Sequence, residues 1–413
     1  MASPQQPTTI ENLPNKLLSN ILIRLLAKQL AQLRCISKPW NGLLSQPSFI
    51  KSHLDRSVHN NDEILMIFYK GFSFKSKPFS AHLTRSPHIE VTSFIKLPSI
   101  PNSDYPLCGV IGSVNGLICF HNFKSQREYV IHIWNPSLSA LLTLPPYSSP
   151  SRYDGYIDII FRFGFDPKTD DYKVVKLASL SSMEDTRFCT VDSWLPVEVY
   201  SMRSGDWKII PERFPVFVTR VFDLDEVCVD GHDGHLHWLG YIDEEMLQET
   251  IIAFDLNTEN FTEIPFPDCL VDYNNLRINV LGVLAGKICL ISYISHDEGN
   301  IEVWVMDEYG VADSWVKHRR FSRFCCQLSP FGFTLKNEFL YQPHNSYLAL
   351  YDPIAAKVKS FKFKTKASFI GDVKFVQYVD SLVWLAPSDC ATSWCNIASL
   401  QISKEESVSL KDE

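Results

Sequence analysis

The chain has 413 residues, of which 45% are hydrophobic and 21% charged, with a formal net charge of −8 at pH 7. This composition is typical of a globular protein and excludes wholesale disorder. Nucleic-acid binding is not expected, because it needs a basic face that displaces counterions from phosphate. Aromatic residues make up 13% of the chain, which favours β-structure.

The start of the chain and its cysteines indicate a compartment. The first thirteen residues lack the basic segment and apolar run of a secretory signal, and we expect residues 1–10 to be flexible. No apolar run is long enough to span a membrane. The 11 cysteines include no CxxC pair and are interpreted as reduced thiols. We therefore expect a cytoplasmic or nuclear protein that does not contact membranes.

Residues 11–56 are predicted to form a small helical domain. Apolar residues recur every three or four positions from Leu13 to Leu26, the pattern of an amphipathic helix. A second short helix follows, then a third capped by Ser37 with Pro39 in its first turn, and a last one opened by Pro47. A domain this small cannot bury all of its leucines by itself. Either the rest of the chain or a separate partner must therefore cover part of this apolar row.

The charge of this segment differs from that of the remaining chain. It contains two acidic residues, Glu11 and Asp55, and seven basic ones: Lys16, Arg24, Lys28, Arg34, Lys38, Lys51 and Arg56. A basic head on an acidic body indicates two modules with different partners.

The residues of the head closely resemble the plant F-box. The most specific string is Leu33-Arg34-Cys35-Ile36-Ser37-Lys38-Pro39-Trp40. The resemblance implies that the helices dock on a Skp-type adaptor, which links the receptor to a cullin scaffold. Carried over by position, the adaptor-facing residues are Leu13, Pro14, Leu17, Ile21, Leu22, Leu25, Leu33, Ile36 and Trp40. The chain departs from the family at Leu26, where the family usually has a proline that marks the break between the first two helices.

Residues 60–403 are predicted to form an all-β domain, followed by a polar tail at 404–413. Short β-branched and aromatic runs alternate with Gly, Pro, Asp and Asn. A weak repeat of about 50 residues, seen at Leu117, Lys173, Leu236, Ile288, Phe339 and Leu382, has the length of one propeller blade. Ile64–Tyr69 and Ser381–Trp384 are its terminal copies. We expect seven blades, or six if the terminal copies share one, with a β-sandwich as the structural alternative.

This body is similar to the kelch-like F-box-associated domain that follows plant F-boxes. The matching strings include Ile111-Gly-Ser-Val-Asn-Gly-Leu117, Trp134-Asn-Pro-Ser137, Phe163-Gly-Phe-Asp-Pro167 and Asp170-Asp-Tyr-Lys-Val-Val175. The resemblance implies the substrate receptor of an SCF-type ubiquitin ligase, whose β domain binds a protein target. The alternative from another class is a propeller that binds a small molecule or glycan, as a lectin or hydrolase, with a helical cap.

No catalytic residue, metal site or cofactor is predicted. The chain has none of the usual nucleophile, zinc-protease or phosphate-loop motifs. One cluster has metal-like composition: Asp230, His232, Asp233, His235 and His237. It is interpreted as a turn entering a strand. Asp170, Asp171, Asp223, Asp225 and Glu226 are likewise interpreted as turn acids, and the basic run 317–320 as a solvated face.

Target binding is expected in loops at one rim of the propeller, because the strands are committed to the core. The longest unpatterned stretches are 99–107, 148–158, 179–195 and 265–276. Their aromatic residues are candidate anchors for a target: Tyr105, Tyr153, Tyr156, Trp194 and Tyr273.

Overall fold

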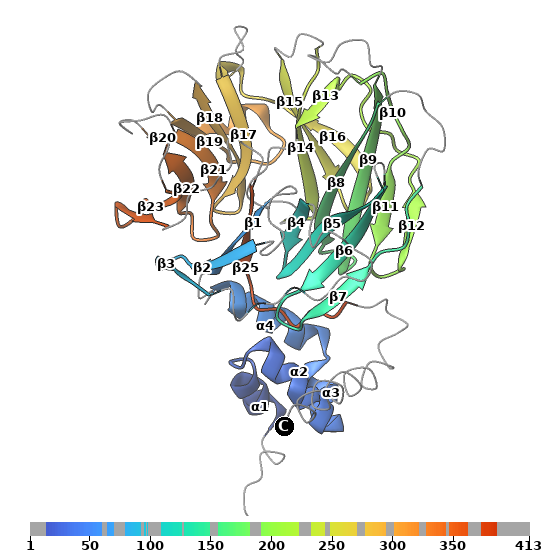
Figure 1. Cartoon of the computed structure of the whole chain (residues 1–413), viewed down its shortest axis with the longest axis vertical. Helices are drawn as coiled ribbons and strands as arrows, with labels where there is room; N and C mark the ends of the chain where they lie inside the picture. Colours follow the sequence, from blue (N-terminus) through green and yellow to red (C-terminus); the bar gives the residue numbers. More distant parts are fainter. Residues whose placement is uncertain are drawn as a thin grey trace, which may run out of the picture.

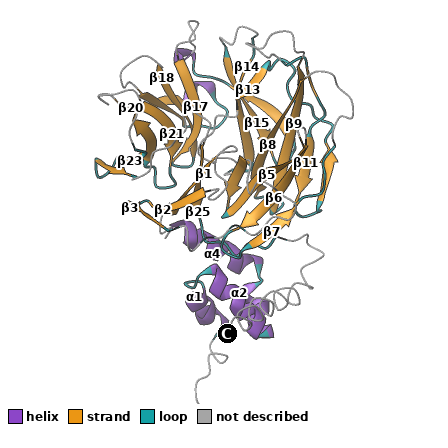
Figure 2. Ribbon diagram, viewed as in Figure 1, coloured by secondary structure: helices purple, strands orange, loops and turns teal. Residues whose placement is uncertain are grey.

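The computed structural model consists of a small helical head and a larger body of β-sheets (Figures 1 and 2). It describes residues 14–59, 64–69, 79–91, 95, 97, 109–125, 128–148, 156–181, 191–222, 233–243, 248–270, 277–294, 301–321, 328–343, 347–361 and 373–385. Within these ranges no helix has the length and apolar character needed to cross a membrane.

The head contains four helices: α1 (Asn15–Leu22), α2 (Ala27–Ile36), α3 (Lys38–Leu44) and α4 (Pro47–His59). The predicted order is correct, although α1 ends earlier than its apolar stripe and α4 is longer than expected. Pro39 lies in the first turn of α3 as predicted, whereas the side chain of Ser37 makes no capping hydrogen bond. The break between α1 and α2 forms without a proline, since Leu26 adopts an extended conformation with φ −66° and ψ 149°.

The body contains six antiparallel sheets arranged as the blades of a propeller. Blade 1 holds β25 (Val373–Tyr378), β1 (Ile64–Tyr69), β2 (Phe79–Leu83) and β3 (Ser86–Glu90). Blade 2 holds β4 (Gly109–Val114), β5 (Leu117–Ser125), β6 (Glu128–Asn135) and β7 (Ala140–Thr143). Blade 3 holds β8 (Tyr156–Asp166), β9 (Asp171–Ser181), β10 (Ser193–Trp194), β11 (Glu198–Ser201) and β12 (Asp206–Ile209).

The other three blades follow in chain order. Blade 4 holds β13 (Arg220–Phe222), β14 (His235–Tyr241), β15 (Glu249–Asp255) and β16 (Asn260–Ile264). Blade 5 holds β17 (Arg277–Leu284), β18 (Lys287–Ile294), β19 (Ile301–Met306) and β20 (Trp315–Phe321). Blade 6 holds β21 (Leu328–Phe333), β22 (Phe339–Pro343), β23 (Ala349–Asp352) and β24 (Lys357–Ser360). Short 3₁₀ turns occur at Asp268–Leu270 and Ala312–Ser314.

The ring closes within blade 1, where β25 pairs with β1 from the start of the body. Phe375 lies opposite Ile67 in this register and is fully buried. Closure by strands from both ends of the body gives six blades, the smaller of the two predicted numbers, and the prediction of a sandwich is wrong. The closing strand is nevertheless not the predicted one, because Ser381–Trp384 forms no strand and follows β25 as an irregular segment.

The repeated Asp or Asn noted in the sequence holds the hairpin turns. Asp166, Asp255 and Asp352 each accept hydrogen bonds from the backbone N–H groups two and three residues later. Short carboxylates favour such turns because they can accept bonds from their own backbone. The periodicity therefore reflects turn chemistry as well as strand packing.

The head sits on one end of the ring, which we call the head end. Leu138, in the β6–β7 turn, packs against the apolar core of the head. A side chain at Gly116, in the β4–β5 turn, would collide with the carbonyl of Val379 just after β25. Since every blade is antiparallel, the turns after its first and third strands also lie at the head end.

Candidate functional site

The two apolar rows of α1 have different surroundings. Leu18 and Leu22 are buried in the head core with Ala27, Leu30 and Leu44. Leu17 and Ile21 lie one turn apart on another face and are 52% and 54% exposed. This helix therefore packs inward through one row and presents the other to solvent.

The remaining predicted adaptor residues divide between surface and core. Pro14 is exposed, and Ile36 at the end of α2 is 74% exposed. Leu25, Leu33 and Trp40 are partly buried against the head core. Leu22 is 5% exposed, so in this structure it supports the helix from within. Leu13 lies outside the described residues.

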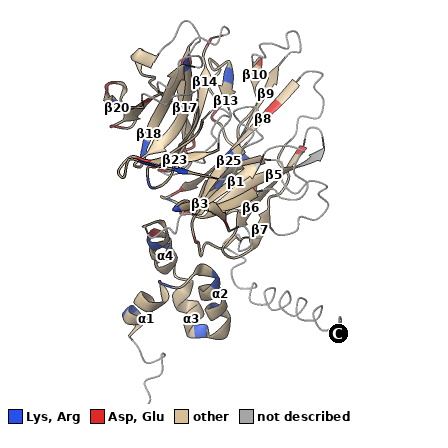
Figure 3. Cartoon of the chain, turned by 60° about the vertical axis from the view of Figure 1, so that its left-hand side comes forward, with Lys and Arg blue, Asp and Glu red and all other residues tan. Residues whose placement is uncertain are grey.

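Basic residues occur on all four helices of the head (Figure 3). Lys16, Arg24, Lys28, Lys38 and Lys51 are all exposed. A basic and apolar face complements an acidic partner that also buries apolar surface.

The segment that follows β25 joins the head to the ring. Asp380 accepts a hydrogen bond from the backbone N–H of Ala27 at 2.8 Å, at the first turn of α2. A carboxylate is favourable there because it meets both an unpaired N–H and the positive end of the helix dipole. Leu382 is fully buried within the head core, and the guanidinium of Arg34 lies 4.2 Å from the ring centroid of Trp384.

The same segment is bound to blade 2. The amide of Asn135 donates hydrogen bonds to the carbonyls of Ser381 and Val383, at 3.0 and 2.8 Å. The Ser137 hydroxyl accepts one from the backbone N–H of Ser381 at 3.0 Å. Asn135 and Ser137 both belong to the Trp134-Asn-Pro-Ser137 string, so this turn holds the segment that links the head to the ring. We refer to residues 380–384 as the clamp.

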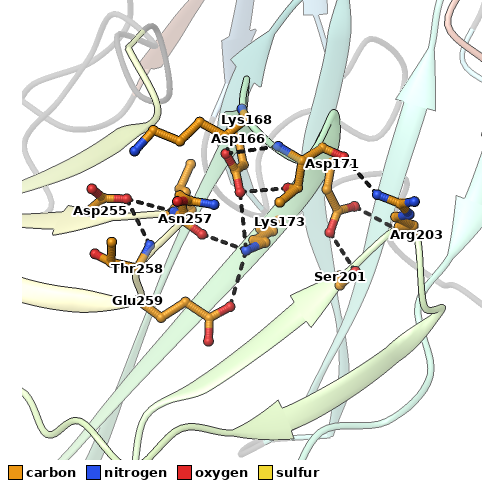
Figure 4. Close-up of polar contacts among 12 residues, drawn as sticks. Asp166, Lys168, Asp171, Lys173, Ser201, Arg203, Asp255, Asn257, Thr258 and Glu259 are labelled. Carbon is orange, nitrogen blue, oxygen red and sulfur yellow. Dashed lines mark hydrogen bonds and ion pairs between the residues drawn. The ribbon is translucent and has the colours of Figure 1, made fainter.

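The carboxylates of Asp166 and Asp171, at the turn between β8 and β9, make structural contacts (Figure 4). Asp171 accepts hydrogen bonds from the Ser201 hydroxyl at 2.5 Å and the Arg203 backbone N–H at 2.9 Å. The Lys173 ammonium donates to the carbonyl of Leu256 and lies 3.6 Å from Asp166 and 3.1 Å from Glu259. This buried network joins blade 3 to blade 4. Asp223, Asp225 and Glu226 lie outside the described residues.

The metal-like histidines belong to β14. His235 lies 3.8 Å from Asp255, and His237 lies 2.9 Å from the hydroxyl of Tyr309 in the next blade. Burial, together with His235 and Arg162, lowers the pKa of His237 to about 3, so its imidazole is neutral at pH 7. Within the described part of the chain no three His, Cys, Asp or Glu residues are grouped to hold a metal. Asp230 and His232 lie outside that part.

Two of the predicted target anchors are described. Tyr156 begins β8 and is 59% exposed, at the end of the ring opposite the head. Trp194 is partly buried; its ring centroid lies 4.4 Å from that of Phe214, and its indole N–H donates to the Val218 carbonyl. Trp194 therefore takes part in packing blade 3 against blade 4. Tyr105, Tyr153 and Tyr273 lie outside the described residues.

Comparison with known families matches both parts of the chain. Residues 10–52 match the F-box domain, and residues 63–380 match the F-box associated beta propeller domain. The chain belongs to the plant F-box proteins with an associated propeller.

Individual relatives agree with this assignment. F-box protein CPR1 of Arabidopsis thaliana is 30% identical over 74% of this chain and 72% of its own length. An F-box/kelch-repeat protein of the same plant is 26% identical over 74% of this chain and 78% of its own length. Among solved structures, TolB from Acinetobacter baumannii has a TM-score of 0.41 at 11% identity, covering 76% of this chain and 66% of TolB.

Proposed function

We propose that this F-box protein is the substrate-recognition subunit of an SCF-type ubiquitin ligase. In this role the head binds a Skp-type adaptor and through it a cullin, and the propeller binds the protein to be ubiquitinated. The observation that carries the proposal is the exposed row of Leu17 and Ile21 on an F-box head whose core is already closed. Apolar side chains held outward on a rigid helix are suited to a partner groove.

The proposed subunit acts by proximity and does not transfer ubiquitin itself. It holds a target beside a charged enzyme, which raises the effective concentration of the reacting groups. The clamp supports this mechanism, because it fixes the orientation of the adaptor-binding head relative to the propeller. Such a receptor would act in the cytoplasm or the nucleus.

The proposal is tested by capture of adaptor and cullin on the full chain. Wild type is compared with Leu17→Asp/Ile21→Asp and with a matched pair, Val216→Asp/Phe217→Asp, whose residues are exposed on the body. We expect wild type and the matched pair to capture both partners, and the α1 variant to capture neither. Equal capture by all three chains would refute the assigned surface, and no capture by folded wild type would refute the receptor role.

A further inference from the structure

An apolar groove lies between blades 5 and 6 and has a volume of about 430 Å³. Its floor is formed by Val303, Val305, Phe321, Phe333 and Phe339. Its rim consists of turns at the head end of the ring and of residues on the outer strand β20. This volume lies within the range of binding pockets, roughly 300–1,000 Å³.

The groove is open at its outer edge, where the side chains are smaller than the tryptophans that fill the space between other blades. Neighbouring blades diverge outward, so large side chains are needed to fill the space between them. Between blades 2 and 3, Trp207 packs on Tyr147, and between blades 4 and 5 Trp315 packs in a shared apolar cluster. At its outer edge the groove instead has Val316, which is 49% exposed, and Ile354, which is 94% exposed.

A β-bulge places two basic side chains on the groove wall. The register of β19 and β20 pairs Val303 with Arg319 and Trp304 with Lys317, which leaves His318 as the extra residue. Consecutive residues at a bulge can therefore face the same side, and both His318 and Arg319 line the groove. At the head end the floor is closed by a hydrogen bond from the Ala285 N–H to the Asn337 side chain, at 2.8 Å.

The outer strands of blades 5 and 6, β20 and β24, are basic, although the chain as a whole has a negative net charge. β20 and β24 contain no Asp or Glu and five Lys or Arg: Lys317, Arg319, Arg320, Lys357 and Lys359. Lys317 is paired with Glu302 and Lys359 with Glu338.

Among the charged residues that line the groove, Lys287 is paired with Asp307, whereas Arg319 forms no ion pair within the described residues. Lys357 faces away from the groove, because it shares a face of β24 with Lys359, which lies opposite Leu350 in the core between blades 6 and 1. The charge of Arg319 is therefore available to a ligand.

We propose that this groove is the target-recognition site and that it binds an extended acidic segment of the target protein. One large aliphatic or aromatic side chain of that segment enters the apolar floor, while a flanking carboxylate meets Arg319. Apolar burial supplies most of the affinity, and the charges select the partner and orient it. The inference rests on the proposed receptor function, since it names the chemistry of the receptor's target.

The test uses the full chain and a random 12-residue peptide library displayed on phage. Selected peptides are then synthesised, and their binding is measured by fluorescence anisotropy. The two groove variants are Val316→Trp, which fills the groove from its exposed edge, and Arg319→Glu. Their matched controls are Val216→Trp, at a valine of the body that is 83% exposed and does not line the groove, and Arg213→Glu on the exposed surface of the body.

We expect selected peptides to combine net negative charge with a large apolar residue. They should bind each groove variant at least tenfold more weakly than wild type and bind both controls as wild type does. Added salt should weaken their binding, because the charges are solvent-accessible. The proposal is overturned if no peptide is selected, if the peptides lack negative charge, or if Val316→Trp binds them normally.

Adaptor capture by each variant serves as a separate readout. Groove variants that still capture the adaptor are folded, so their loss of peptide reports the groove alone. If wild type selects acidic peptides but does not capture the adaptor, the groove is supported as a peptide-binding site and the receptor role is refuted.

Discussion

At the residue scale, Lys173 is the buried cation on which the contact between blades 3 and 4 depends. Its side chain is 8% exposed, and the Asp166 carboxylate beside it is 1% exposed. Burial raises the pKa of Asp166, but hydrogen bonds from Thr169 and Lys168 and the charge of Lys173 outweigh this effect, so that the pKa lies below its usual value. The carboxylate therefore stabilises the fold in its ionised form.

We predict that Lys173→Met lowers the free energy of unfolding by about 3 kcal/mol at pH 7, because it leaves buried carboxylates without their cation. The matched change Lys168→Met, on the exposed side of the same turn, should cost less than about 0.5 kcal/mol. Urea unfolding of the three chains measures both effects.

The same comparison has a defined dependence on pH. A carboxyl group with a lowered pKa stabilises the fold above its unfolded pKa, near 4, and that contribution is lost as the pH falls through the folded value. The difference in unfolding free energy between wild type and Lys173→Met should therefore be largest at pH 7 and should decrease below about pH 4. If this difference in unfolding free energy increased at lower pH, Asp166 would not be the partner through which Lys173 stabilises the fold.

At the element scale, the start of α2 depends on a residue 353 positions away in the chain. Asp380→Ala removes the carboxylate that accepts from the Ala27 N–H, and loss of such a cap costs about 1 kcal/mol. We predict faster hydrogen exchange in the first turn of α2, with Asp313→Ala, an exposed acid of the body, as the control. The Leu26 N–H also donates a hydrogen bond to the side-chain oxygen of Gln29, at 3.1 Å. Unchanged exchange in Asp380→Ala would mean that this local contact suffices to begin the helix.

The elements also show how far the sequence predicts the structure. Periodicity located the four helices and the repeated hairpins, since those signals depend on neighbouring residues. It could not separate Leu17 from Leu18 as exposed and buried, because Leu382 and Leu138 complete the core that buries Leu18. It likewise could not identify β25 as the closing strand, since alternation in Val373–Tyr378 does not specify its partner.

The groove was not predicted for a related reason. Its floor is assembled from four strands, β19 to β22, and its shape depends on a bulge that no local pattern marks. Only the basic run at 317–320 was visible in the sequence, where it was interpreted as a solvated face. The surrounding charges were therefore detectable, but the apolar cavity was not.

At the scale of the whole molecule, the clamp makes the head and the propeller structurally dependent on each other. We predict that Leu382→Ala lowers the free energy of unfolding by about 2–5 kcal/mol, because it leaves a cavity in the head core. It should also weaken adaptor binding, although Leu382 is buried and lies outside the exposed apolar row. Val216→Ala, at a position 83% exposed, should change neither quantity. Thermal unfolding and adaptor affinity, measured on the same preparations, test this coupling.

The most direct test of the receptor account is a calorimetric titration of purified Skp-type adaptor into the full chain, comparing Leu17→Ala and Ile21→Ala with Val216→Ala. Truncation of an apolar anchor at the centre of an interface usually costs about 1–2 kcal/mol or more, roughly tenfold in affinity. The account predicts that each α1 variant binds about tenfold more weakly with unchanged unfolding, and that Val216→Ala binds as wild type. Equal affinity in all three variants would contradict it.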